Sequence, residues 1–154
     1  MRYSLLISIL VLSLVACKKD KYTSVPQITF ESIKPDVWDV TNLDPTQGPI
    51  LTFHLTDAEG DIGFNDNQDT SYIYVKNLTV APYKTDSLKF PNLTGMNKKN
   101  LNVDVSVLIR SVLQPSSRPR PHVDTLFFEL YVKDFAKNKS NVLTPDKPVY
   151  YVVP

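Results

Sequence analysis

The sequence predicts an all-β domain, an antiparallel two-sheet sandwich of immunoglobulin-like type. Apolar residues recur at every second position in several short runs, whereas no window of ten or more residues after Pro26 has an apolar 3.6-residue period. The chain contains 12 prolines, and clusters of Asn, Asp, Ser and Thr separate the apolar runs, which is typical of turns between short strands. No helical pattern stands between the strands, so two packed sheets are expected. A small closed barrel is the alternative.

The alternating runs follow one another along the chain as candidate strands. In residues 50–56, Leu51, Phe53 and Leu55 alternate with polar residues and should face the core. The clearest run is 101–109, and both faces of the last strands are partly apolar. Between the later strands, the basic and proline-rich segment 114–122 is expected to be a long exposed loop. In order, the expected strands begin at Ile28 and cover 50–56, 72–75, 101–109, 126–132 and 149–153.

The first residues have the composition of a lipoprotein signal peptide. One positive charge, Arg2, precedes an apolar run from Leu5 to Ala16, which is too short for the roughly 20 residues of a transmembrane helix. The sequence Leu14-Val15-Ala16-Cys17 resembles a lipobox, in which the cysteine thiol takes a diacylglycerol, and Cys17 is the only cysteine of the chain. An ordinary secretory signal that ends in cysteine is the alternative. We therefore expect a signal peptide at 1–16, the lipidated Cys17 with a flexible tether to residue 25, and the sandwich at 26–154.

A lipid on Cys17 makes a membrane the first expected partner. Each buried methylene contributes about 0.8 kcal/mol, so two or three acyl chains hold a protein at a membrane almost permanently. Lys18 and Lys19 follow the cysteine, which is not the Asp-type signal for retention at the inner membrane, and Asp20 is compatible with surface export. We expect lipid anchoring at the outer membrane, with the periplasmic or cell-surface face undecided.

The overall charge does not favour a nucleic-acid partner. Without Arg2 the chain has 16 basic and 16 acidic side chains, so no net field attracts a polyanion. We expect a monomer.

One acidic segment is a candidate ion site. Residues 35–75 contain eight acidic and no basic side chains, and Asp57, Glu59 and Asp61 follow directly on an expected strand. Closely spaced carboxylates beside glycine can supply several of the oxygens that Ca²⁺ requires. The segment is not an EF-hand, because Gly60 takes the fourth place of the loop and Gln68 the twelfth. A solvated turn whose carboxylates cap backbone amides is the alternative interpretation.

A second segment extends this hypothesis. The sequence Asp-Ala-Glu-Gly-Asp-Ile-Gly after one strand, combined with Asp134-Phe135-Ala136-Lys137-Asn138-Lys139-Ser140-Asn141 near the end, resembles the single-domain Ig-like lipoproteins of Bacteroidetes-type bacteria. The family pattern prefers glycine where Lys137 stands, so the turn departs from it there. The resemblance implies an exported, anchored Ig-like domain, and it does not imply a reaction. With it, we predict a calcium site made by Asp57, Glu59, Asp61 and Asp134.

Catalytic patterns are poor, and we expect no enzyme. His54 and His122 are interpreted as plain surface histidines. His122-Val123-Asp124 could form half of a catalytic triad, but no Gly-x-Ser-x-Gly nucleophile turn accompanies it.

Aromatic side chains offer the main alternative function. On outward sheet faces they could stack on sugars in a carbohydrate-binding or nutrient-capture accessory, although cross-strand aromatics more often stabilise sheets. Ser87 and Thr125 stand in Asp-Ser/Thr-Leu sequences that resemble a bacterial O-glycosylation motif. The domain could thus bind a glycan or an envelope protein. The candidate aromatics are Trp38, Tyr72, Tyr74, Phe127, Tyr131, Tyr150 and Tyr151.

Overall fold

The computed structural model describes residues 20–154 except 42–43, 45, 65–69, 94–95 and 97. Cys17 and the expected signal peptide therefore lie outside the described residues. Within them the fold contains nine strands and no helix, so the all-β prediction is confirmed. The strands are β1 (Gln27–Lys34), β2 (Val37–Asp39), β3 (Ile50–Asp57), β4 (Tyr72–Asn77), β5 (Thr85–Lys89), β6 (Leu101–Leu108), β7 (His122–Leu126), β8 (Phe128–Lys133) and β9 (Val149–Val153).

The first layer is an antiparallel sheet with the strand order β1-β3-β6. The central strand β3 pairs along its whole length with β6, from Ile50 opposite Leu108 to Asp57 opposite Leu101. The pairing of β1 with β3 shifts by one residue between Phe30 and Ser32, which is a β-bulge that bends this strand.

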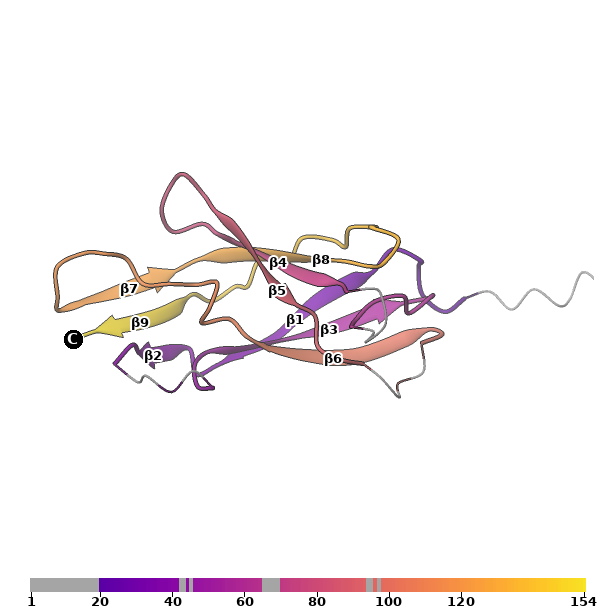
Figure 1. Cartoon of the computed structure of the whole chain (residues 1–154), viewed down its shortest axis with the longest axis horizontal. Helices are drawn as coiled ribbons and strands as arrows, with labels where there is room; N and C mark the ends of the chain where they lie inside the picture. Colours follow the sequence, from indigo (N-terminus) through magenta and orange to yellow (C-terminus); the bar gives the residue numbers. More distant parts are fainter. Residues whose placement is uncertain (1–19, 42–43, 45, 65–69, 94–95, 97) are drawn as a thin grey trace, which may run out of the picture.

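The second layer consists of two three-stranded sheets, β2-β9-β7 and β5-β4-β8, which share one long strand. Only Phe127 separates β7 from β8, and the chain runs almost straight through both (Figure 1). The strand order of the two layers matches an immunoglobulin-like sandwich. The pair β2 and β9 is parallel, so the expectation of a purely antiparallel sandwich is corrected at this edge.

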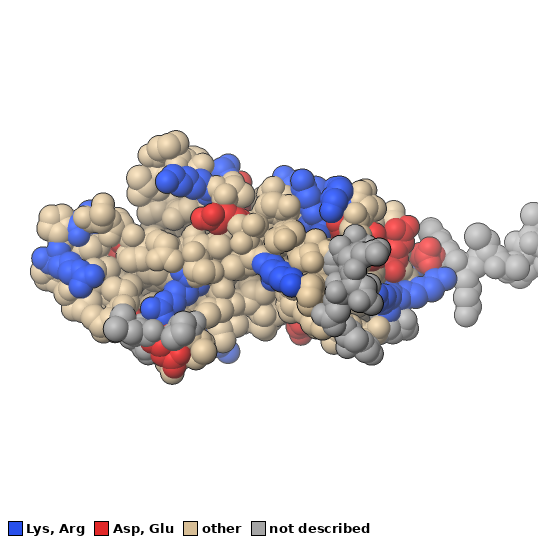
Figure 2. Space-filling model, in the orientation of Figure 1, with Lys and Arg blue, Asp and Glu red and all other residues tan. Residues whose placement is uncertain are grey.

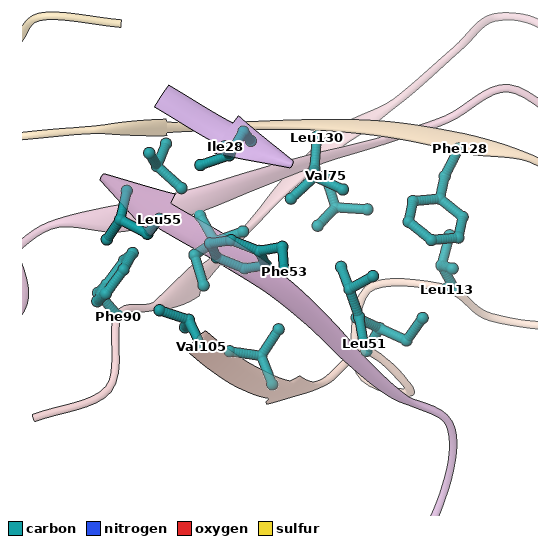
Figure 3. Close-up of a cluster of buried hydrophobic side chains, with 14 of the residues drawn as sticks. Ile28, Leu51, Phe53, Leu55, Val75, Phe90, Val105, Leu113, Phe128 and Leu130 are labelled. Carbon is teal, nitrogen blue, oxygen red and sulfur yellow. The ribbon is translucent and has the colours of Figure 1, made fainter. Parts of the chain in front are cut away.

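One hydrophobic core lies between the layers. Phe53, Leu55 and Leu51 of β3 are fully buried, as their alternation predicted, and they face Leu130 and Phe128 of β8 (Figure 3). Two layers packed face to face are consistent with a sandwich and not with the alternative of a small closed barrel. The buried hydrophobic residues of the described chain run from Ile28 to Val153, so a chain that begins at Lys18 keeps all of them.

The six predicted strands are all present, and three strands were missed. Strands β2 and β5 have no alternating apolar pattern because they lie at sheet edges with most of their side chains exposed. Strand β7 begins at His122, where the sequence predicted the end of a loop. A buried charged residue, Asp124, interrupts its apolar alternation.

Candidate metal centre

Asp57 is placed by the same alternation that fills the core. It is the last residue of β3 and follows Leu51, Phe53 and Leu55 on the inner face, so its side chain points inward and is fully buried. Neither carboxylate oxygen accepts a hydrogen bond within the described part of the chain. A buried carboxylate without donors is costly, because water no longer stabilises its charge.

Asp61 follows Asp57 after a tight turn, and this turn requires glycine at position 60. Gly60 has a φ of 62°, and a Cβ at this position would lie 1.7 Å from the carbonyl oxygen of Lys98. The Oδ1 atom of Asp61 is buried and also accepts no hydrogen bond among the described residues. The backbone oxygen of Asp61 accepts a 2.8 Å hydrogen bond from the amide of Phe135, which brings the late loop to the same place.

Asp134 begins that late loop, directly after β8. Its side chain is buried and accepts hydrogen bonds from the amide of Asn138 at 2.7 Å and from Asn138 Nδ2 at 2.8 Å. Lys137 has a φ of 71°, so a lysine adopts the left-handed conformation that the family pattern gives to glycine. The turn therefore forms in spite of the departure at Lys137.

The electrostatics of the three aspartates are coupled. The pKa of Asp57 is raised from 3.8 to about 6, first by burial and then by the charges of Asp61 and Asp134, while the nearby amide of Glu59 opposes them. The charged form of Asp57 is thus destabilised in the folded protein. A cation beside it would relieve both the burial and the repulsion.

The charges of Asp61 and Asp134 both act on Asp57, and a backbone hydrogen bond joins the two loops, but the structure leaves Glu59 exposed at the tip of the turn. In the portion that is described, no three Asp, Glu, His or Cys side chains form a ready-made metal-binding group. Calcium binding therefore stays a prediction. Asp66 and Asp69, which continue the acidic segment, lie outside the described residues.

The alternative of a solvated, amide-capping turn fits these aspartates only in part. Asp134 caps the amide of Asn138, as that interpretation requires. Asp57 is not solvated, because it is buried, and its oxygens accept no hydrogen bond of full geometry from a described residue, although the amide of Glu59 lies close enough to lower its pKa.

The histidines have different environments. His54 lies on the outer face of β3 and its Nδ1 is 2.7 Å from Oδ1 of Asp104 on β6. The prediction of a plain surface histidine is wrong for His122, whose side chain is only 9% exposed. It lies on the same face of β7 as the buried Asp124, and its Nε2 atom lies close to Ser116 and Asp124.

The His122 cluster does not have the geometry of a catalytic triad. His122 Nε2 lies 3.4 Å from Ser116 Oγ and 3.5 Å from Asp124 Oδ2, while Nδ1 is 3.0 Å from the carbonyl oxygen of Pro119. A triad requires the serine and the carboxylate on opposite ring nitrogens. Ser116 and Arg118 both donate to Asp124 instead, so the cluster fastens the loop 114–121 to β7.

This cluster was missed by sequence reasoning. Burial alone would raise the pKa of Asp124, but the hydrogen bonds from Ser116 and Arg118 outweigh it and lower the pKa. The signal in the sequence was Asp124, which shares the inward face with Leu126 two positions later. A charged residue at such a position requires a buried partner.

The aromatic residues mainly stabilise the sheets. Tyr74 of β4 and Tyr131 of β8 stack on each other with centroids 4.9 Å apart, and the ammonium groups of Lys133 and Lys139 lie over these rings. Tyr151 is buried, so the prediction that its ring faces outward is wrong. Trp38 is half-buried beneath Arg110, whereas Tyr72, Phe127 and Tyr150 are exposed.

The two candidate glycosylation residues differ in access. Ser87 is exposed on β5 opposite Tyr74. Thr125 is half-buried on β7, and the neighbouring Asp124 is occupied by Ser116 and Arg118. Glycosylation at either residue stays a prediction.

Comparison with known proteins adds no relative. No protein-family model, curated protein or solved structure matches the chain. Across the described ranges, no helix is long and apolar enough to cross a membrane.

Proposed function

We propose that the chain is a lipid-anchored lipoprotein of the bacterial outer membrane, whose sandwich is a non-enzymatic binding or structural module that holds one Ca²⁺. Cys17 carries the anchor, and the run from Leu5 to Cys17 supports this assignment. The ion lies between the turn after β3 and the loop after β8, with Asp57, Asp61 and Asp134 as its carboxylate ligands.

The observation that carries the calcium assignment is the buried carboxylate of Asp57. Its oxygens accept no hydrogen bond among the described residues, and Asp61 presents a second buried oxygen in the same condition. Two such anions side by side require a positive charge or a proton. Ca²⁺ takes about six to eight oxygen ligands, which carboxylates, backbone carbonyls and water supply together.

The position of the site gives the ion a structural role. The amide of Ala58, next to Asp57, donates a 3.0 Å hydrogen bond to the carbonyl oxygen of Thr23 in the tether, and Phe135 is hydrogen-bonded to Asp61. Bound calcium would therefore fasten three segments that are distant in sequence. Because this end carries the tether, the ion would stiffen the domain where it leaves the membrane.

The test is the melting temperature of the chain from Lys18 in millimolar Ca²⁺ and in EDTA. An ion that binds only the folded state adds about 2.7 kcal/mol at a hundredfold excess over Kd, which corresponds to several degrees. Asp61→Asn should remove most of this increase, whereas Glu59→Gln, which removes the same charge from an exposed position, should keep it. Equal melting in Ca²⁺ and in a NaCl solution of the same ionic strength would contradict the calcium site.

The alternative function is a glycan-binding accessory that uses the exposed aromatics. The exposed ring of Tyr72 favours it, but Tyr74 and Tyr131 turn their ring faces to each other and to lysines, which leaves little flat surface for a sugar. A glycan array probed with and without chelator distinguishes the two functions. Chelator-independent binding that is lost in Tyr72→Ala would favour the glycan.

A further inference from the structure

A groove of about 830 Å³ lies at the end of the molecule that carries the C-terminus. Three segments line it: the turn between β4 and β5, the loop 114–118, and residues 123–126 of β7. The hairpin of β4 and β5 projects away from the sheet beside β7 (Figure 1), and Figure 2 shows a notch in the surface between the hairpin and this end.

The strand β7 presents a free backbone edge to this groove. On β9, the amide of Tyr150 donates to Asp36 and the oxygen of Val152 accepts from Val40, so both residues point toward β2. The alternate residues of β9 therefore face β7, where their partners are His122, Asp124 and Leu126. It follows that the backbone groups of Val123 and Thr125 point away from β9 and into the groove.

The pairing of β4 with the long strand stops just before this edge. The oxygen of Phe127 accepts from the amide of Leu78 at 2.8 Å, and its amide donates to Thr79 Oγ1 at 3.0 Å. Strand β4 ends at Asn77, whose amide donates to the oxygen of Lys84, and the hairpin of β4 and β5 leads away from β7 (Figure 1). Two residues further along the long strand, the N–H and C=O of Thr125 point the same way, and no described turn or loop makes a backbone hydrogen bond to them.

The far end of the edge is closed by Arg118. Its guanidinium donates to the backbone oxygen of Val123 at 2.8 Å and also to the carboxylate of Asp124. The open stretch therefore consists of the N–H of Val123 and both backbone groups of Thr125, between Thr79 on one side and Arg118 on the other.

The walls of the groove indicate the side chains of its occupant. Val80 and Val123 are 64% and 52% exposed, and Ala81 and Pro82 continue the apolar surface. Lys84 and Arg118 are the two cations of the lining, and the one acidic residue, Asp124, is buried and bonded to Arg118. The groove therefore favours an occupant with an apolar side chain for the apolar surface and a neighbouring carboxylate for the cations.

We propose that this groove binds an extended, acidic segment of a partner protein, which adds to β7 as a further strand. A row of unpaired N–H and C=O groups is matched by another peptide backbone, and neighbouring side-chain pockets then supply specificity. The four residues of β7 that line the groove span about 13 Å, enough for a short strand. The segment pairs with Thr125, its apolar side chain lies against Val80 and Pro82, and its carboxylate faces Lys84.

The experiment selects binders from a displayed library of random peptides about nine residues long, with the chain from Lys18 as the target. The selected peptide is then synthesised, and hydrogen exchange of the target is followed with and without it. We expect acidic, alternating apolar sequences, and the peptide should slow exchange at the amides of Val123 and Thr125. The amide of Asp124, already paired with β9, should change little.

Two variants make the result specific to the edge. Thr125→Pro removes an N–H that does not pair with β9, so the fold should remain while peptide binding weakens by at least about tenfold. Lys84→Glu should weaken acidic peptides and not their lysine-substituted counterparts. The proposal is overturned if the library yields no peptide, if a backbone N-methylated peptide binds equally well, or if the edge pairs instead with a second copy of the chain, detected as a dimer that Thr125→Pro dissociates.

Discussion

Asp57→Asn should stabilise the metal-free protein at neutral pH, although it removes a proposed ligand. Burial raises the pKa of Asp57 from 3.8 to about 6, so the folded state holds this proton more tightly than the unfolded chain. The contribution of Asp57 to the free energy of unfolding is therefore most favourable below about pH 4, falls as the pH rises to about 6, and stays lower above it. At about 1.4 kcal/mol per pKa unit, the cost at pH 7 is about 3 kcal/mol.

Asparagine avoids this cost because it carries no charge, and its amide can donate to the unpaired oxygen of Asp61. Its own buried polar atoms offset part of the gain, by about 1–2 kcal/mol, so a net stabilisation of about 1–2 kcal/mol is expected. That gain corresponds to a few degrees in Tm.

The assay is thermal unfolding of the chain from Lys18 in EDTA at pH 7 and at pH 4, with Glu59→Gln as the exposed control. The difference in Tm between Asp57→Asn and the parent should be positive at pH 7 and should shrink or vanish at pH 4, where Asp57 is protonated in the folded parent. The control should differ little from the parent at either pH. A variant that melts below the parent at both pH values would refute the electrostatic cost assigned to Asp57.

Further predictions concern the anchor, the loop fastening, the strained turn and the core. Cys17→Ser in the native host should leave an unprocessed precursor without labelled fatty acid; equal labelling would exclude lipidation. Because the pKa of Asp124 is lowered, its stabilising contribution exists above about pH 4 and is lost in acid, so Asp124→Asn should reduce urea stability at pH 7 by about 1–3 kcal/mol and by less at pH 3. Lys137→Gly should raise stability by up to about 1 kcal/mol, and an equal loss would show that the left-handed turn carries no strain. Phe53→Ala should cost about 3–5 kcal/mol in urea unfolding, against little change for the outer-face Thr52→Ala.

Much of the fold could be predicted from the sequence because strand burial in this chain follows alternation. Leu51, Phe53 and Leu55 face the core as their spacing requires. The edge strands β2 and β5 could not be predicted in this way, because their side chains are mostly exposed and so apolar and polar residues do not alternate along them. The parallel pairing of β2 with β9 depends on contacts between the two ends of the chain and leaves no local pattern.

The candidate site was predicted in outline and not in detail. The sequence predicted one site made by Asp57, Glu59, Asp61 and Asp134, and a backbone hydrogen bond between Phe135 and Asp61 joins the two loops that carry these residues. It did not separate the inward Asp57 from the exposed Glu59, although their positions in the strand and the turn differ. The cluster around Asp124 was missed because Ser116 and Arg118 reach it from a loop whose path no periodicity describes.

Calcium binding itself is tested most directly by calorimetric titration of Ca²⁺ into the chain from Lys18 after treatment with chelator. The coupled aspartates predict saturable binding of one ion per chain, stronger at pH 7 than at pH 5 because the ion displaces the proton of Asp57. Asp57→Asn should abolish it and Glu59→Gln should preserve it. Heats that do not saturate at millimolar Ca²⁺, or binding that Asp57→Asn leaves unchanged, would contradict the proposed site.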